Sequence, residues 1–248
     1  IQSLRGISVI LVIFYHLNID YFSKGYLGVD IFFVISGYVI TQRLYKDYLE
    51  NKKISIMSFY LRRFFRIFPN LFFIVSFVYV FYLIFGAPDV SLFKSTIFSI
   101  FGLSNLFFLF ENKNYFDTLL GNLLSDPLSH TWSLGIEEQF YLIYPFILFV
   151  FFTFTKKNKI NKTIFFLVIV LITSLIASLF LQYELSIANK IESFFSLILY
   201  KIFGLPSNPP KELIIFYFPF FRFWEFIVGC IFFFIGSNVV KNNFLSIL

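Results

Sequence analysis

The first hydrophobic run of the chain carries two titratable side chains whose spacing could serve a reaction. Arg5 and His16 lie eleven positions apart in this run. On an α-helix, that spacing places them about 16 Å apart along the axis and on one face, because eleven steps of about 100° are close to three turns. A neutral imidazole is a natural general base near pH 7. A histidine hydrogen-bonded between helices and an arginine that reaches the membrane surface are the ordinary alternatives.

Two adjacent carboxylates form a second candidate group. Glu137 and Glu138 lie about two turns into a hydrophobic stretch that starts near His130. An ionised side chain at the centre of a bilayer costs at least about 2.5–3.5 kcal/mol, so at least one of the two should find a partner inside a helix bundle. The pair could relay protons, orient His16 or form an ion pair with an arginine. A purely structural ion pair is the ordinary alternative.

Three arginines belong to the strongest charge feature of the chain, the basic stretch over residues 46–66. Arg62, Arg63 and Arg66 follow one another at helical spacing in the run from residue 59 to residue 69. Arg62 and Arg66 share a helix face, where their guanidinium groups could bind phosphates bidentately. Anchoring of the chain to anionic lipid is the alternative.

Other polar side chains at the ends of hydrophobic runs have two readings each. Asp30, near the start of the second run, could pair with a cation or hold a substrate hydroxyl, or it could simply cap a helix. Trp132 is equally suited to a membrane–water interface. Arg222 and Glu225 stand at the start of the last hydrophobic run. The sequence contains no glycine-rich phosphate loop, HExxH metal motif or GxSxG serine motif, and we expect no metal site.

The composition requires a membrane as solvent for the elements that carry these residues. Of the 248 residues, 58% are hydrophobic and 14% are charged, and 42 are phenylalanine. A soluble domain has about 25% charged residues and could not bury so much apolar surface. The net charge of +6 then indicates lysines and arginines in cytoplasmic loops, not a nucleic-acid surface. The single cysteine, Cys230, excludes an internal disulfide framework. We therefore expect an all-α polytopic transmembrane helix bundle.

Hydropathy predicts six to seven spans. The predicted spans are residues 3–19, 27–45, 69–86, 131–153, 164–182 and 217–236, with 92–110 as either a seventh span or a re-entrant segment and 183–216 as a mixed segment. A basic loop over residues 46–66 favours a cytoplasmic location, which also puts the N-terminus in the cytoplasm. The positions of later lysines slightly favour the re-entrant version of 92–110.

Five sequence blocks, in order along almost the whole chain, resemble the membrane-bound acyltransferase-3 family. The blocks are Arg5 and His16 with ten residues between them, residues 25–41 with Asp30 and Ser36, residues 59–69 with Arg62, Arg63 and Arg66, residues 129–145 with Trp132, Glu137 and Glu138, and residues 222–229 with Arg222 and Glu225. The resemblance implies multi-pass proteins of the bacterial inner (cytoplasmic) membrane. Such proteins O-acylate, most often O-acetylate, cell-envelope carbohydrates: lipopolysaccharide O-antigen, peptidoglycan or exopolysaccharide.

The resemblance also implies the partners of the reaction. Acetyl-CoA, or another acyl-CoA, would be a cytoplasmic donor substrate rather than a permanently bound cofactor, and the acceptor sugar would lie on the periplasmic side. The blocks resemble the subtype that often carries further spans and a periplasmic serine-hydrolase-like domain. We therefore expect residues 1–248 to form an acyltransferase-3 transmembrane domain that is truncated at its C-terminal side.

These observations combine into a hypothesis with residue roles. His16 acts as general base or carries the acyl group, and Glu137 or Glu138 orients it or moves its proton. The proposed donor-binding residues are Arg5, Arg62, Arg63 and Arg66, and the proposed substrate-binding or structural residues are Asp30, Ser36, Trp132, Arg222 and Glu225. The competing hypotheses are a proton-coupled transporter or flippase of envelope glycan precursors, which should show repeated halves, and a non-catalytic scaffold.

Overall fold

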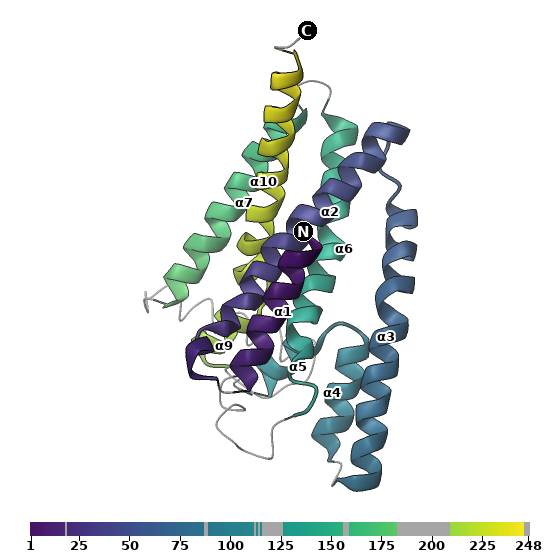
Figure 1. The fold of residues 1–248 in the computed structure, drawn as a ribbon, viewed down its shortest axis with the longest axis vertical. Coiled ribbons are helices and arrows are strands. Elements are labelled where there is room, and N and C mark those ends of the chain that lie inside the picture. The colour runs from purple at the N-terminus through teal and green to yellow at the C-terminus, as the bar shows by residue number, and fades with distance from the viewer. Residues whose placement is uncertain are drawn as a thin grey trace. The chain divides into compact units, whose positions relative to one another are not determined.

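The computed structural model describes residues 1–17, 19–86, 89–111, 113, 115, 126–155, 159–182 and 209–245. These residues form helices and no strand, which confirms the predicted all-α fold (Figure 1). The α-helices are α1 (Gln2–His16), α2 (Gly28–Asn51), α3 (Ile56–Phe85), α4 (Val90–Ile100), α5 (Ser104–Phe110), α6 (Thr131–Phe154), α7 (Lys159–Gln182), α9 (Lys211–Tyr217) and α10 (Pro219–Leu245). Two short 3-10 helices, η1 (Asp20–Phe22) and η2 (Gly25–Leu27), connect α1 to α2.

The polytopic character of the chain rests on long apolar helices. Among the described residues, five segments are long and apolar enough to cross a bilayer: Gly25–Asn51, Ile56–Phe85, Thr131–Phe154, Ile160–Gln182 and Lys211–Gly236. Helix α1 has 15 residues, about 22 Å, and ends at His16 rather than at residue 19 as predicted, because a polar 3-10 turn begins at Asp20. Most of the predicted mixed segment, residues 183–208, lies outside the described residues.

The predicted start of the third span at Pro69 was wrong. Helix α3 begins at Ile56 and continues through Pro69. A proline removes one backbone hydrogen bond, but membrane helices tolerate it because neighbouring groups satisfy the freed backbone. The arginine cluster therefore lies on a helix, and the predicted basic loop is mostly helical as well. Between α2 and α3, Lys52 turns the chain with a φ of 56°, a left-handed conformation typical of helix ends.

The segment at 92–110 is a pair of short helices. Helix α4 has 11 residues and α5 has 7, so neither can cross a hydrocarbon core of about 30 Å. Asp89 caps α4 by accepting a hydrogen bond from the Leu92 amide at 2.7 Å. Between the helices, Gly102 has a φ of 68°, a region that a side chain disfavours. These lengths fit the re-entrant alternative.

The chain divides into two compact units. The first unit contains residues 1–59, 140–174 and 223–248, and the second contains residues 60–139 and 175–222. Helix α6 contributes its first nine residues to the second unit and the rest to the first. Each unit is described separately below.

In the first unit, α2 and α10 cross at two glycines. A side chain at Gly37 would collide with the Phe226 carbonyl, and a side chain at Gly229 would collide with the Val34 carbonyl. Small residues of this kind let membrane helices approach backbone to backbone. Beside the crossing, Phe226 stacks between Phe33 and Phe140, with ring centroids 4.4 Å from each.

The same unit pairs α1 with α2 through small residues, and Figure 1 shows the two helices side by side. The backbone of Gly28 packs against the Ser8 carbonyl, and the backbone of Gly25 packs against the Leu11 carbonyl. In both places a β-carbon would overlap a backbone atom. Glycine at the start of α2 therefore sets the distance at which α1, with Arg5 and His16, lies on α2.

Candidate functional site

Arg5 is held against α2 by neutral groups. Its guanidinium donates a hydrogen bond to the Ser36 hydroxyl at 3.2 Å and lies over the Phe32 ring, 5.4 Å from the centroid. Ser36 is fully buried, and Arg5 is half-buried. The buried Arg5 Nε has no hydrogen-bond partner in the described part of the chain. The structure thus links two residues that the sequence blocks placed separately.

His16 is the last residue of α1. Because α1 is one uninterrupted helix from Gln2 to His16, it keeps the eleven-residue register that the sequence predicts for Arg5 and His16. The imidazole is half-buried and makes an edge contact with Tyr15 at 5.5 Å, and Tyr15 makes another with Tyr26. A polar ring that can bind and release a proton therefore stands at the end of the first helix.

In the second unit, Glu137 and Glu138 of α6 face Arg63 of α3. One carboxylate oxygen of Glu137 lies 3.4 Å from a terminal guanidinium nitrogen, and Glu138 lies 3.8 Å from Nε. The side chains of Arg63 and Glu137 are 18% and 6% exposed, whereas that of Glu138 is 31% exposed. Of the partners predicted for the acidic pair, this structure shows the arginine.

The three clustered arginines therefore separate by helix face. Arg62 and Arg66 are exposed on α3, one turn apart, while Arg63 lies toward α6. The two exposed guanidinium groups keep the geometry that could bind phosphate, whereas Arg63 compensates carboxylates.

Trp132 and Arg222 belong to an aromatic cluster of the second unit. Arg222 lies 5.8 Å from the Trp132 ring centroid and 5.7 Å from that of Phe216, so its charge is placed over two aromatic faces. Tyr115 contacts Trp132 at 5.7 Å, and its hydroxyl lies 3.3 Å from Nδ1 of His130. Partial burial lowers the pKa of His130, so its imidazole is neutral at pH 7. Trp132 is 2% exposed and acts as a core residue in this cluster.

Asp30 and Glu225 occupy the first unit at different depths. Asp30 lies in the first turn of α2, where a negative charge is favourable, and is half-buried. Glu225 is 1% exposed on α10, next to the stacked Phe226. A carboxyl group buried to this degree fits a structural or a proton-transfer role.

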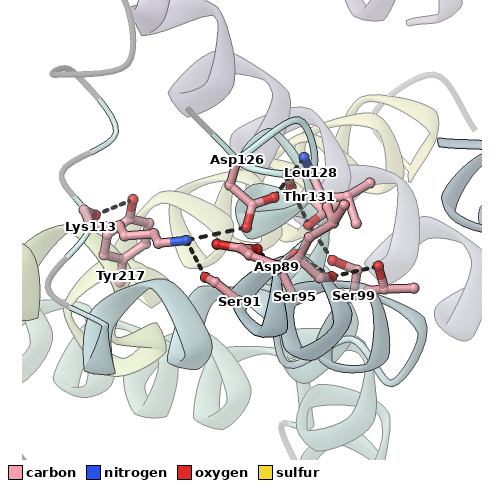
Figure 2. Close-up of polar contacts among 11 residues, drawn as sticks. Asp89, Ser91, Ser95, Ser99, Lys113, Asp126, Leu128, Thr131 and Tyr217 are labelled. Carbon is pink, nitrogen blue, oxygen red and sulfur yellow. Dashed lines mark hydrogen bonds and ion pairs between the residues drawn. The ribbon is translucent and has the colours of Figure 1, made fainter. Parts of the chain in front are cut away.

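Sequence reasoning missed a polar network at the start of α4 and α6. Figure 2 shows Lys113 pointing toward Ser91, at 2.7 Å, and toward Asp126, at 3.4 Å. The Asp126 carboxylate also accepts a hydrogen bond from the Leu128 amide. The Tyr217 hydroxyl donates a hydrogen bond to the Lys113 carbonyl at 3.0 Å. Asp126 differs from an ordinary loop aspartate in being buried, and the sequence of a polar loop does not reveal burial.

Two amide side chains, one buried and one half-buried, were also missed. Asn105 of α5 and Gln139 of α6 are hydrogen-bonded to each other at 2.8 Å, and Gln139 donates to the Gly102 carbonyl at 3.0 Å. An asparagine within the apolar segment 92–110 was the signal that could have found them. Among the described residues, no three His, Cys, Asp or Glu side chains gather as metal ligands would.

Comparison with known proteins places these features in a family. Residues 1–247 match the acyltransferase-3 family, described as an acyltransferase domain. Peptidoglycan O-acetyltransferase OatA of Listeria monocytogenes is 43% identical over 162 residues, which are 64% of this chain and 25% of that protein. O-acetyltransferase OatA of Staphylococcus aureus is 40% identical over 167 residues, 66% of this chain and 27% of that protein. No solved structure matches the chain.

The extent of the match settles family membership but not the activity of the whole protein. The chain spans about a quarter of the length of the curated relatives it matches. The family match, in contrast, covers nearly every residue, including the candidate residues on α1, α2, α3, α6 and α10. The chain therefore belongs to the acyltransferase-3 family.

Proposed function

We propose that this chain is the membrane part of an O-acetyltransferase that moves an acetyl group from acetyl-CoA to a hydroxyl of a cell-envelope carbohydrate. The observation that carries the proposal is the packing of α1 on α2. Ser36 and Phe32 of α2 contact Arg5 of α1, and α1 ends in His16. The names of its relatives favour peptidoglycan as the acceptor polymer, ahead of O-antigen or exopolysaccharide.

His16 is the general base of the proposed reaction. Its imidazole takes the proton of the acceptor hydroxyl, the oxygen attacks the thioester carbonyl carbon, and the carbon–sulfur bond breaks to release CoA. In the alternative sequence, His16 attacks the thioester itself and passes the acetyl group to the hydroxyl. Arg5, whose described partners Ser36 and Phe32 are neutral, guides the donor's pantetheine or thioester end into the bundle.

Donor binding and proton movement are assigned to the second unit. Arg62 and Arg66, both exposed on α3, bind the phosphates of acetyl-CoA. Arg63, which lies within ion-pair distance of Glu137 and Glu138, orients them for proton relay. The contribution of Arg63 to donor binding remains a prediction that donor titration would test.

The orientation of the helices in the membrane follows from their lengths and from the basic residues. If α4 and α5 do not cross, the connection at residues 52–55 and the lysine-rich connection after α6 lie on the same side. The positive-inside tendency makes that side the cytoplasm of a bacterial inner membrane; if α1 also crosses, its N-terminus is cytoplasmic as well. A periplasmic serine-hydrolase-like domain of the full-length protein remains a prediction.

The test compares the two histidines of the chain in the full-length protein. His16→Gln should lower O-acetylation of the acceptor polymer by at least about 10²-fold, since it removes the general base. His130→Gln, the matched control, should retain most of the activity. Mass spectrometry of purified envelope glycans measures the acetyl group on each sugar. Normal acetylation with His16→Gln would overturn the proposal. If this variant instead lost transport of envelope glycan precursors while acetylation stayed unchanged, the transporter alternative would be favoured.

A further inference from the structure

Three residues of the second unit form a hydrogen-bonded link that we call the amide clasp: Gly102, Asn105 and Gln139. Gln139 of α6 donates from Nε2 to the Gly102 carbonyl at 3.0 Å and to the Asn105 Oδ1 at 2.8 Å. Asn105 donates from Nδ2 to the Tyr217 carbonyl of α9 at 3.0 Å. Asn105 is fully buried. The clasp therefore joins the break between α4 and α5 to both α6 and α9.

The chemistry of the clasp allows one orientation of its amides. The carbonyls of Tyr217 and Gly102 can only accept hydrogen bonds, so each must face an NH2 group. Asn105 then presents its oxygen to Gln139, whose NH2 group has a second hydrogen to donate. A buried amide without partners is costly in an apolar environment, so these contacts must form together with the fold.

The clasp lies on the turn of α6 that carries the acidic pair. A β-carbon on Gly102 would lie 3.5 Å from the β-carbon of Glu138, and one on Gly135 would lie 2.7 Å from the Asn105 oxygen. Gly135, Glu138 and Gln139 thus face the α4–α5 break together. The backbone at Gly102 therefore lies next to Glu138 of the acidic pair.

The acidic pair depends on this placement because its contacts with Arg63 are long. The distances of 3.4 Å and 3.8 Å lie within ion-pair range but beyond the usual 2.7–3.2 Å of a strong hydrogen bond. A displacement of α6 away from α3 would lengthen these two contacts further. The clasp restrains α6 at the residue that directly follows Glu138.

We infer that the amide clasp is a positioning device for catalysis: Gln139 and Asn105 hold the Glu137–Glu138 pair against Arg63 in the geometry that proton relay requires. Neither amide touches a reacting atom. The inference rests on the proposed function for the role of the acidic pair, whereas the positioning itself can be measured without any activity.

The experiment uses the full-length protein in membranes with Gln139→Leu and the milder Gln139→Asn. Gln42→Leu, at an exposed position of α2, is the matched control. The first readout is the rate at which a hydrophobic carbodiimide labels Glu137 and Glu138, measured by peptide mass spectrometry. Loss of the clasp should speed the labelling at least fivefold, because the carboxylates leave the shield of Arg63. The second readout is acetyl transfer per folded molecule.

Positioning predicts a kcat at least tenfold lower for Gln139→Leu, an unchanged donor KM and a displaced pH–rate profile. A smaller effect in the same direction for Gln139→Asn would support it, since that side chain keeps the amide group on a shorter stem. Labelling and specific activity equal to those of Gln42→Leu would overturn the inference. If the unaltered protein transfers no acetyl group, the proposed function fails, and the labelling rates alone decide the positioning.

Discussion

Arg5 of the first unit and Arg63 of the second unit have opposite kinds of partner. Arg5 in the first unit contacts a serine hydroxyl and a phenylalanine ring, whereas Arg63 in the second unit faces two carboxylates. A partly buried cation with neutral partners keeps its attraction for an incoming anion, but a compensated cation has little left to offer one. The comparison teaches that Arg63 already lies beside two carboxylates, whereas the described contacts of Arg5 are with neutral groups, as the proposed donor-binding role requires.

The largest effect that separates the two arginines is expected for stability. Arg63→Ala removes the cation that lies beside Glu137, whose side chain is 6% exposed, and beside Glu138. The loss should lower the free energy of unfolding by about 3–5 kcal/mol. Arg62→Ala, on the exposed face, should change it by no more than about 0.5 kcal/mol. Thermal unfolding of the purified protein in detergent measures both. Equal midpoints for the two variants would contradict the structural role of Arg63.

For Arg5, the effect should appear in activity instead. Arg5→Gln should lower kcat/KM for acetyl-CoA by about 10- to 10²-fold, since a hydrogen bond to a charged group contributes about 1.5–3 kcal/mol. Because its partner Ser36 is neutral, we expect the free energy of unfolding to change by less than about 1.5 kcal/mol. Arg43→Gln, an exposed arginine of α2, is the control for charge removal. An Arg5→Gln protein with full activity would remove the basis of the comparison.

A smaller effect should follow from changing the spacing that supports Arg5. Gly28→Ala brings a β-carbon into the Ser8 carbonyl, so α1 must move away from α2 at a cost of about 1–3 kcal/mol, with a partial loss of activity. Gly6→Ala is a matched control, since a β-carbon there meets no atom within 4 Å. Unfolding midpoints and acetyl transfer, measured side by side, test the difference. If Gly28→Ala behaved like Gly6→Ala, the close approach of the helices would not matter for Arg5.

The helical bundle and the register of Arg5 and His16 could be predicted from sequence because both depend on local periodicity. A regular helix over residues 2–16 is enough to align the two side chains. The need of Glu137 for a partner was also predictable, since burial of an isolated charge in a membrane is costly. The identity of that partner was not, because Arg63 is 74 residues away in the chain.

Local patterns also failed where one residue decides the backbone. Hydropathy treats 92–110 as one apolar segment, while the left-handed φ of Gly102 divides it into two helices. Conversely, Pro69 predicts a helix start, but the backbone of α3 continues through it. The amide clasp was beyond reach as well, because Asn105 bonds to a carbonyl 112 residues further along the chain.

The glycine crossing of α2 and α10 has a consequence for biogenesis. The hydrogen bond between Cys230 and the Gly37 carbonyl joins residues separated by 193 positions. At a synthesis rate of about 5–20 residues per second, α2 waits roughly 10–40 s in the membrane before α10 is made. During that time Thr41 can satisfy its hydroxyl within α2, on the Gly37 carbonyl at 2.7 Å. The hydroxyl of Thr41 is thus hydrogen-bonded within the nascent helix until its partner arrives.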